Sequence, residues 1–188
     1  FSSSMALTPS NMIPLGTIAP NFTLPDTVSG TSYGLQQLKG KQGTMVMFIC
    51  NHCPYVKHIN SQLVKLANDY MPKGINFIAI SSNDATAQPD DAPDKMKELA
   101  QKEGYPFPYL YDESQAVAKA YDAACTPDFY IFDADLKLVY RGQLDDSRPS
   151  NNKPLTGADI RIALDALLSG TAISPRQKPS IGCNIKWK

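Results

Sequence analysis

The chain has 188 residues, a length that suits one domain, and its 43% of hydrophobic residues is too many for a disordered protein. Its 18 Lys and Arg balance 18 Asp and Glu, and the net charge of +0 argues against binding to nucleic-acid phosphates or to a membrane surface. Four cysteines are too few for a small scaffold held together by disulfides, so they leave a redox site, a metal site or inert buried thiols.

The first half of the chain predicts two buried strands joined by a helix. Residues 11–25 carry three prolines and should be extended or looped, and Val28–Thr31 is typical of a hairpin turn. Apolar runs at Thr44–Ile49 and Ile75–Ile80 predict strands that are buried on both faces. Between them, apolar residues recur at helical spacing from Val56 to Tyr70, which predicts one helix.

The second half predicts helices that alternate with short strands after a polar loop at 81–93. Thr156 followed by Asp159 resembles a capping box at the start of the last helix, and Ser114 is expected to cap an earlier one. The expected elements are helices at 94–103, 114–124 and 156–170, a strand at 108–111, and a hairpin of strands at 128–132 and 136–140.

This order of elements indicates an α/β fold whose central mixed β-sheet is flanked by helices. One parallel crossover joins the strands at 44–49 and 75–80. Ligands of such sheets bind at the carboxyl ends of the strands, and Cys50–Cys53 directly follows the first of these strands.

The ends of the chain predict a cytoplasmic protein without a membrane anchor. No stretch reaches the roughly 18 apolar residues of a membrane helix, and the first residues lack the regions of a signal peptide. We expect Met5 to be the natural start and Phe1–Ser4 to be a remnant of cloning, with a removed export signal as the alternative. In a reducing compartment, paired cysteines indicate catalysis or metal binding more than structure.

Pro54 decides which cysteine of the Cys50–Cys53 pair lies at the helix start. Proline is favoured at the first helical position, where its missing N–H is not needed, so Cys53 should be the N-cap residue. The free N–H groups of a helix N-terminus stabilise a thiolate. We therefore expect Cys53 to be the nucleophile and Cys50 to be its neighbour at the end of the strand.

Several segments resemble the thioredoxin superfamily. Residues 48–56 (Phe-Ile-Cys-Asn-His-Cys-Pro-Tyr-Val) resemble its active-site turn, with Cys53 in the place of the first cysteine. Residues 16–40 resemble the redoxin branch, which holds alkyl hydroperoxide reductase and thiol-specific antioxidant proteins. Thr126-Pro127 resembles the substrate-facing cis-proline loop, and residues 180–188 resemble the ending of a peroxiredoxin-like subgroup.

This resemblance implies a thioredoxin-like domain at residues 14–170 with an N-terminal hairpin extension. Tails are expected at 1–13 and 171–188, and no regular structure is predicted for the second of them. The implied function is thiol–disulfide exchange by Cys53, with protein or small-molecule disulfides and a thiol reductant as partners and with no cofactor.

Two other functions compete with this interpretation. A thiol peroxidase with antioxidant activity is the first, although Val56 and Cys53 stand where typical peroxiredoxins carry cysteine and Thr or Ser. Those enzymes also use an arginine to orient the peroxide, and this chain has no arginine before Arg141 to match it. The second alternative is a non-catalytic binding or metal-holding protein. Its four soft ligands would be Cys50, His52, Cys53 and Cys183, but only one paired ligand knuckle is present, so no metal site is predicted.

Exchange requires a second cysteine that opens the mixed disulfide. Cys50, Cys125 and Cys183 are the candidates, and we favour Cys50 because it is closest in sequence to Cys53. His52 and His58 flank the site. A protonated imidazole there would stabilise the Cys53 thiolate, while two solvent-exposed histidines are an equally good interpretation.

Overall fold

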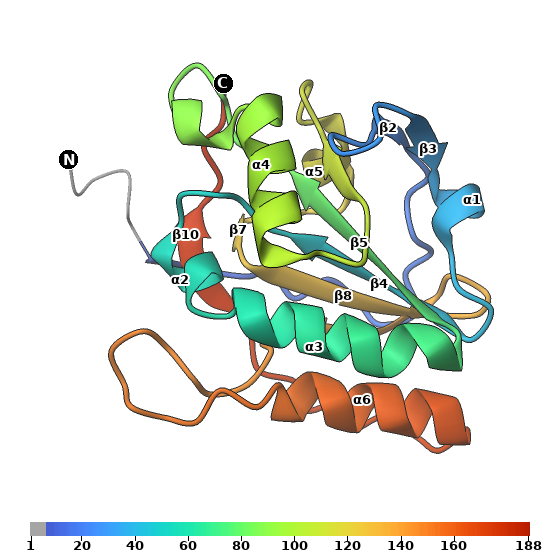
Figure 1. Ribbon diagram of the computed structural model, residues 1–188. Coiled ribbons are helices and arrows are strands. Elements are labelled where there is room, and N and C mark those ends of the chain that lie inside the picture. Colours follow the sequence, from blue (N-terminus) through green and yellow to red (C-terminus); the bar gives the residue numbers. More distant parts are fainter. Residues whose placement is uncertain (1–6) are drawn as a thin grey trace.

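The computed structural model describes residues 7–188, and the expected start at Met5 and the expected remnant at residues 1–4 lie outside this range. Its centre is a five-stranded mixed sheet in the order β6-β5-β4-β8-β9 (Figure 1). The strands β4, β5 and β6 run parallel to one another, and β8 and β9 are antiparallel to their neighbours. Their bounds are β4 Gly43–Phe48, β5 Ile75–Ser81, β6 Tyr109–Tyr111, β8 Asp128–Asp133 and β9 Leu138–Gly142.

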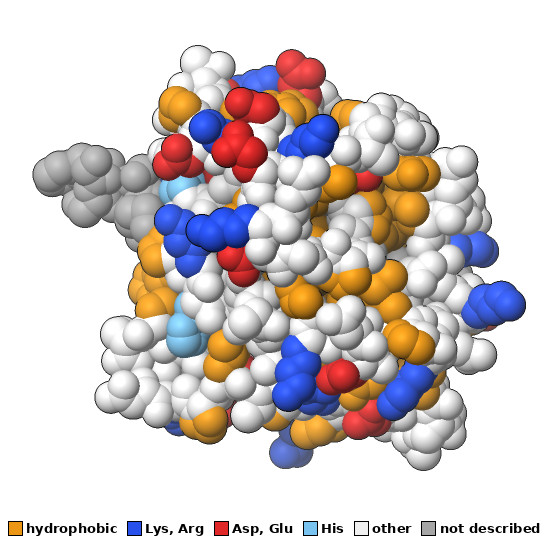
Figure 2. Space-filling view, viewed as in Figure 1, with side chains coloured by type: hydrophobic (Ala, Val, Ile, Leu, Met, Phe, Trp, Pro, Cys, Tyr) orange, Lys and Arg blue, Asp and Glu red, His pale blue; other side chains and the backbone are white. Residues whose placement is uncertain are grey.

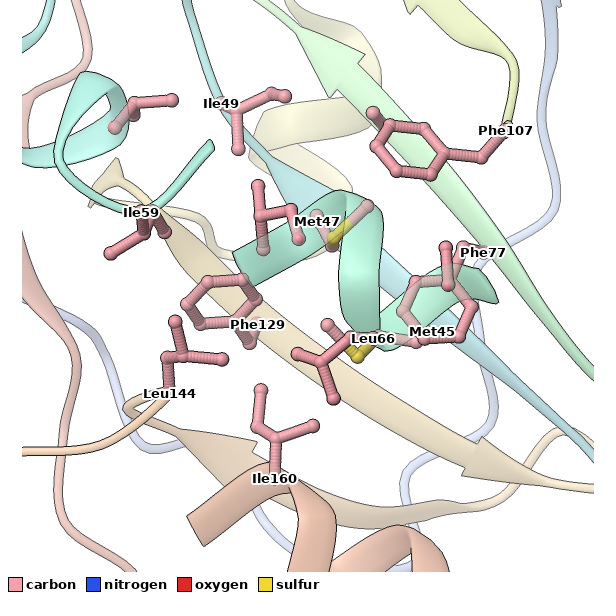
Figure 3. Close-up of a cluster of buried hydrophobic side chains, with 14 of the residues drawn as sticks. Met45, Met47, Ile49, Ile59, Leu66, Phe77, Phe107, Phe129, Leu144 and Ile160 are labelled. Carbon is pink, nitrogen blue, oxygen red and sulfur yellow. The ribbon is translucent and has the colours of Figure 1, made fainter. Parts of the chain in front are cut away.

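Side chains of β4 alternate between two hydrophobic clusters, one on each face of the sheet. Met45 and Met47 point to the cluster under α3, α4 and α6, together with Phe129 from β8 (Figure 3). Val46 and Phe48 point to the opposite cluster, which α1 and α5 cover. Because side chains alternate along a strand, both faces of a covered strand must be apolar, and the prediction of two-sided burial is confirmed.

The helices flank the sheet as expected, which confirms the α/β class and its mixed central sheet (Figure 1). The parallel crossover from β4 to β5 is confirmed, and so is the N-terminal hairpin of β2 (Thr23–Pro25) and β3 (Ser32–Gly34). The helix bounds are α1 Leu35–Leu38, α2 Pro54–Lys57, α3 Asn60–Tyr70, α4 Pro93–Glu103, α5 Ala116–Ala120 and α6 Ala158–Ser169, with 3-10 turns at Met71–Lys73 and Pro89–Asp91.

Three helix predictions were wrong in detail. The single helix from Val56 to Tyr70 is divided, because the Ile59 N–H donates to the nearer Val56 carbonyl and tightens the turn between α2 and α3. The helix predicted at 114–124 is shorter, since α5 spans only Ala116–Ala120. Ser114 accepts the Ala116 N–H at 3.2 Å, and Asp112 accepts the next two N–H groups, from Val117 and Ala118.

The predicted capping box at the last helix also does not form. Gly157 is the N-cap residue of α6, and the Asp159 carboxylate instead accepts a hydrogen bond from the Gln143 side chain at 2.8 Å. The Thr156 hydroxyl does accept a hydrogen bond from the Ala158 N–H, at 3.2 Å.

The C-terminal segment forms a strand, although the sequence predicted no regular structure there. β10 (Ile181–Asn184) lies between β1 (Leu7–Pro9) and β7 (Cys125–Thr126) in a second sheet and runs antiparallel to both. This pairing joins segments from both ends of the chain, so no local periodicity in the sequence predicts it. The domain boundaries at residues 14 and 170 remain a prediction.

Charged side chains of both signs are interspersed over the face of the molecule in Figure 2. The face shows no large patch of one sign, as the balanced composition leads one to expect. Within the part of the chain that the structure describes, no helix is both long and apolar enough to cross a membrane.

Candidate active site

Cys53 lies where the chain leaves β4 and enters α2. It is the N-cap residue of α2 with extended backbone angles, and Pro54 follows at the first helical position, so this prediction from Pro54 is confirmed. The Cys53 carbonyl accepts hydrogen bonds from the N–H groups of Val56 and Lys57, each at 3.0 Å. The side chain is therefore fixed at the carboxyl end of a central strand.

Cys53 forms a disulfide with Cys183 of β10, and the two Cα atoms are 6.3 Å apart. Both side chains are buried, with exposed fractions of 0% and 1%. The structure differs here from the preference for Cys50 as the partner, because β10 lies beside α2 and brings a sulfur from 130 residues away (Figure 1). Cys50 and Cys125 are both free and buried.

The Thr126-Pro127 peptide bond is cis and lies against this disulfide. The Thr126 carbonyl oxygen is 3.5 Å from the Cys53 sulfur, and the Thr126 hydroxyl is 3.5 Å from the Cys50 sulfur. On the other side, Gly182 passes so close that an added Cβ would overlap the Thr126 carbonyl. Thr126 thus contacts two sulfurs and also the strand that carries the third.

Cys125 is buried in surroundings that differ from those of the other three cysteines. Its sulfur is 3.6 Å from the Pro127 carbonyl oxygen. Burial, and then the charge of Asp128, raises the pKa of the Cys125 thiol well above its ordinary value. A thiol that stays protonated is a poor nucleophile, so this environment favours a packing role for Cys125.

His52 is held in a buried hydrogen-bond cluster rather than exposed to solvent. Its Nδ1 is 2.5 Å from Oδ2 of Asp91, and its side chain is only 11% exposed. The carboxylate of Asp91, and then the nearby Cys50 sulfur, raise the pKa of His52 to about 9 against the lowering effect of burial. The residue is therefore an imidazolium at neutral pH.

Asp91 is a site residue that sequence reasoning missed. It belongs to the polar loop predicted at 81–93, where three Asp residues occur without a spacing that marks one of them. Burial alone would raise the pKa of Asp91, but hydrogen bonds from His52 and Asn83 hold it below its ordinary value.

His58 is the C-cap residue of α2 and is half-buried. Its Nε2 is 2.7 Å from the Ser147 hydroxyl, which donates to the Lys153 carbonyl and therefore accepts from the imidazole. Both residues line a small cavity of about 20 Å³ that also touches Pro127. His58 is thus placed between the active-site helix and the loop at 143–156.

The structure does not bring together the four soft ligands of the metal-holding alternative. Cys53 and Cys183 are bonded to each other, so neither offers a thiolate in this state. Cys50, His52 and Asp91 do place one donor atom each within 4.8 Å of the others. The lone pairs of Asp91 are already taken up by hydrogen bonds, so these residues do not fit a metal ion as they stand.

A disulfide at a strand-to-helix junction, opposite a cis-proline, defines a redox-active protein of the thioredoxin class. A model of the Redoxin family matches residues 14–159, and the chain belongs to that family.

Three similar proteins place the chain within this class. It is 63% identical to an uncharacterized conserved protein from Geobacillus kaustophilus, over 98% of this chain and 97% of that one, with a TM-score of 0.96. It is 27% identical over 125 residues to the thiol-disulfide oxidoreductase ResA of Bacillus thuringiensis, covering 66% of this chain and 67% of that protein. The thioredoxin domain of a Bacteroides vulgatus thiol-disulfide oxidoreductase shares the fold at 18% identity, over 81% of this chain and 99% of that one, with a TM-score of 0.61. The thioredoxin-like fold is therefore confirmed.

Proposed function

We propose that the chain is a thiol–disulfide oxidoreductase in which Cys53 is the nucleophile and Cys183 is the resolving cysteine. The observation that carries this proposal is the Cys53–Cys183 bond at the helix cap, opposite the cis peptide before Pro127. Membership of the Redoxin family and the similarity to ResA support the same reaction.

The reaction takes two exchange steps. The Cys53 thiolate attacks one sulfur of a substrate disulfide, and the other substrate sulfur leaves with the electron pair and takes up a proton. The Cys183 thiolate then attacks the Cys53 sulfur and releases the second substrate thiol. The substrate gains two electrons, the Cys53–Cys183 disulfide is left, and a thiol reductant restores the two thiols.

The backbone beside Cys53 favours an extended polypeptide as the substrate. β10 forms antiparallel pairs with β7, with Cys183 opposite Thr126 and Asn184 opposite Cys125. A substrate strand would use the same N–H and C=O groups of β7. We therefore propose that β10 and the substrate compete for this edge, and that protein disulfides are preferred over small ones.

Disulfide reduction by three variants tests the proposal. The wild-type protein should reduce a protein disulfide, Cys53→Ser should be inactive, and Cys183→Ser should accumulate a mixed disulfide on Cys53. Cys125→Ala is the matched control, since Cys125 is equally buried but is bonded to no other sulfur. Full activity of Cys53→Ser, or an unreactive wild-type protein, would refute the proposal.

The peroxidase alternative gains no support from the arrangement of arginines. Arg141 donates hydrogen bonds to Gln177 and to the Ile13 carbonyl, and Arg148 donates to Gln143 and to two nearby carbonyls. No arginine among residues 7–188 is hydrogen-bonded to the Cys53 sulfur, where it would bind a peroxide. An antioxidant role stays a proposal that peroxide consumption with a thiol donor tests.

A cytoplasmic location also stays a proposal. A disulfide that persists in the native protein would need a partner that oxidises it in a reducing compartment. Cell fractionation, with the redox state of Cys53 and Cys183 trapped by alkylation, decides between the cytoplasm and an oxidising compartment.

A further inference from the structure

Cys50 is a buried free thiol that the proposed cycle leaves unused, yet it lies beside the reacting disulfide. Its sulfur is 3.5 Å from the Thr126 hydroxyl, and the Cys53 sulfur is 3.5 Å from the Thr126 carbonyl oxygen. The two cysteines are also three positions apart on one tight turn. A third sulfur therefore lies in the same buried cluster as the disulfide.

The Asp91 carboxylate is fully occupied by donors from the turn that carries Cys50. Its Oδ1 accepts the backbone N–H groups of Asn51 at 2.7 Å and His52 at 3.1 Å. Its Oδ2 accepts the Asn83 side chain at 3.0 Å and lies 2.5 Å from Nδ1 of His52. These bonds fix both the turn and the orientation of the imidazole.

The second imidazole nitrogen of His52 has no partner. Nε2 is buried and makes no hydrogen bond with any described residue. A donor atom of the imidazole lies within 4.8 Å of the Cys50 sulfur, and Nδ1 is already bonded to Asp91. A buried N–H without a partner is costly, so this side of the His52 ring favours a nearby acceptor, and the Cys50 sulfur is within reach.

The disulfide itself is closed to reagents from solvent, because both of its sulfurs are buried. An external thiol can attack only after the chain moves. Cys50 needs no access from solvent, since it belongs to the same buried cluster as Cys53 and Cys183.

We infer that Cys50 is an internal nucleophile that exchanges with the Cys53–Cys183 disulfide, and that the His52–Asp91 pair fixes the turn that carries it. This inference rests on the proposed function and adds a third redox cysteine to it. The Cys50 thiolate attacks the Cys53 sulfur, and a Cys50–Cys53 bond forms. The Cys53–Cys183 bond breaks, and Cys183 leaves with the electron pair and takes a proton from water. No net oxidation or reduction occurs.

The exchange would separate β10 from the active-site helix without reducing the protein. Cys183 is the covalent link between β10 and α2, and its release leaves β10 held by backbone pairing and packing alone. The edge of β7 that a substrate would use is then covered by a strand that has no covalent link to α2.

Disulfide mapping of Cys183→Ser tests whether Cys50 reacts. The reduced variant is treated with oxidised glutathione, quenched with acid, alkylated and digested for mass spectrometry. We expect a Cys50–Cys53 disulfide, and the same treatment of Cys183→Ser/Cys50→Ala should stop at a mixed disulfide of Cys53 with glutathione. A stable glutathione adduct on Cys53 in the single variant, with no Cys50–Cys53 bond, would overturn the inference.

The role of the His52–Asp91 pair is tested in the same background. His52→Gln and Asp91→Asn should each slow closure of the Cys50–Cys53 bond by about tenfold or more, because each breaks the His52–Asp91 hydrogen bond that fixes the turn carrying Cys50. Asp112→Asn is the matched control: Asp112 is another buried carboxylate with three hydrogen bonds, but its partners are Ser82, Val117 and Ala118.

The closure rate of Asp112→Asn separates this positioning effect from a loss of structure, because it should match the rate of Cys183→Ser alone. Closure that is slowed equally by Asp112→Asn and His52→Gln would overturn the role of His52. A wild-type protein that reduces disulfides through Cys53 and Cys183, while Cys183→Ser never closes Cys50–Cys53, refutes this inference but leaves the proposed function intact.

Discussion

Reduction of the Cys53–Cys183 bond should lower the free energy of unfolding by several kcal/mol. The bond joins residues separated by 130 positions, and the chain-entropy treatment of such a loop gives about 5 kcal/mol. The native state loses little on reduction, because β10 stays paired on both edges and Cys183 stays buried. We therefore expect a loss of about 2–5 kcal/mol, toward the upper end of that range.

Denaturant unfolding of the oxidised and the reduced protein measures this loss. The oxidised chain should unfold at a higher denaturant concentration. Its free energy of unfolding should also depend less steeply on that concentration, because the cross-link keeps the unfolded state compact. The control is Cys53→Ser/Cys183→Ser, whose unfolding should not respond to reductant. Equal midpoints for the oxidised and reduced wild-type protein would refute the reasoning, since the loop would then not constrain the unfolded chain.

Three further predictions concern the groups around the disulfide. Gly182→Ala should destabilise the protein by about 2 kcal/mol or more and slow closure of the disulfide, because the new methyl group overlaps the Thr126 carbonyl. Gly34→Ala, whose methyl group would lie at an ordinary 3.4 Å from its nearest neighbour, is the control in the same unfolding assay. The pKa of His52 is raised from 6.5 to about 9, so its stabilising contribution is complete below pH 6.5 and is lost as the pH rises through 9. Urea titrations across this range should show the loss in the wild-type protein and not in His52→Gln. Burial raises the pKa of Asp128 from 3.8 to about 7, so stability should fall as the pH rises from 3.8 through 7, and Asp128→Asn should remove this fall.

Two results would contradict these pH predictions. An unfolding free energy of His52→Gln that still declines between pH 6.5 and 9 as steeply as in the wild-type protein would mean that His52 is not the titrating group. A stability profile of Asp128→Asn parallel to that of the wild-type protein between pH 3.8 and 7 would mean that Asp128 is charged in the fold.

Local chemistry was enough to predict the central strands and the position of Cys53. The apolar run of β4 and its crossover to β5 follow from side-chain periodicity, which acts over a few residues. Pro54 likewise marked the start of α2, because the constraint it imposes is confined to its own backbone. The same local rules were incomplete at Ser114 and Thr156. Each hydroxyl accepts one N–H at a helix start, but carboxylates from other positions accept neighbouring N–H groups.

The partners of Cys53 and His52 were decided by tertiary structure alone. Cys50 is three residues from Cys53, yet the bond goes to Cys183, because the sheet of β1, β10 and β7 carries that residue to the helix cap. Asp91 reaches His52 from a loop 39 residues away. Strand order and loop packing depend on contacts between distant segments, so the sequence by itself determined which cysteine lies at the helix cap, and only the fold decided which sulfur it is bonded to.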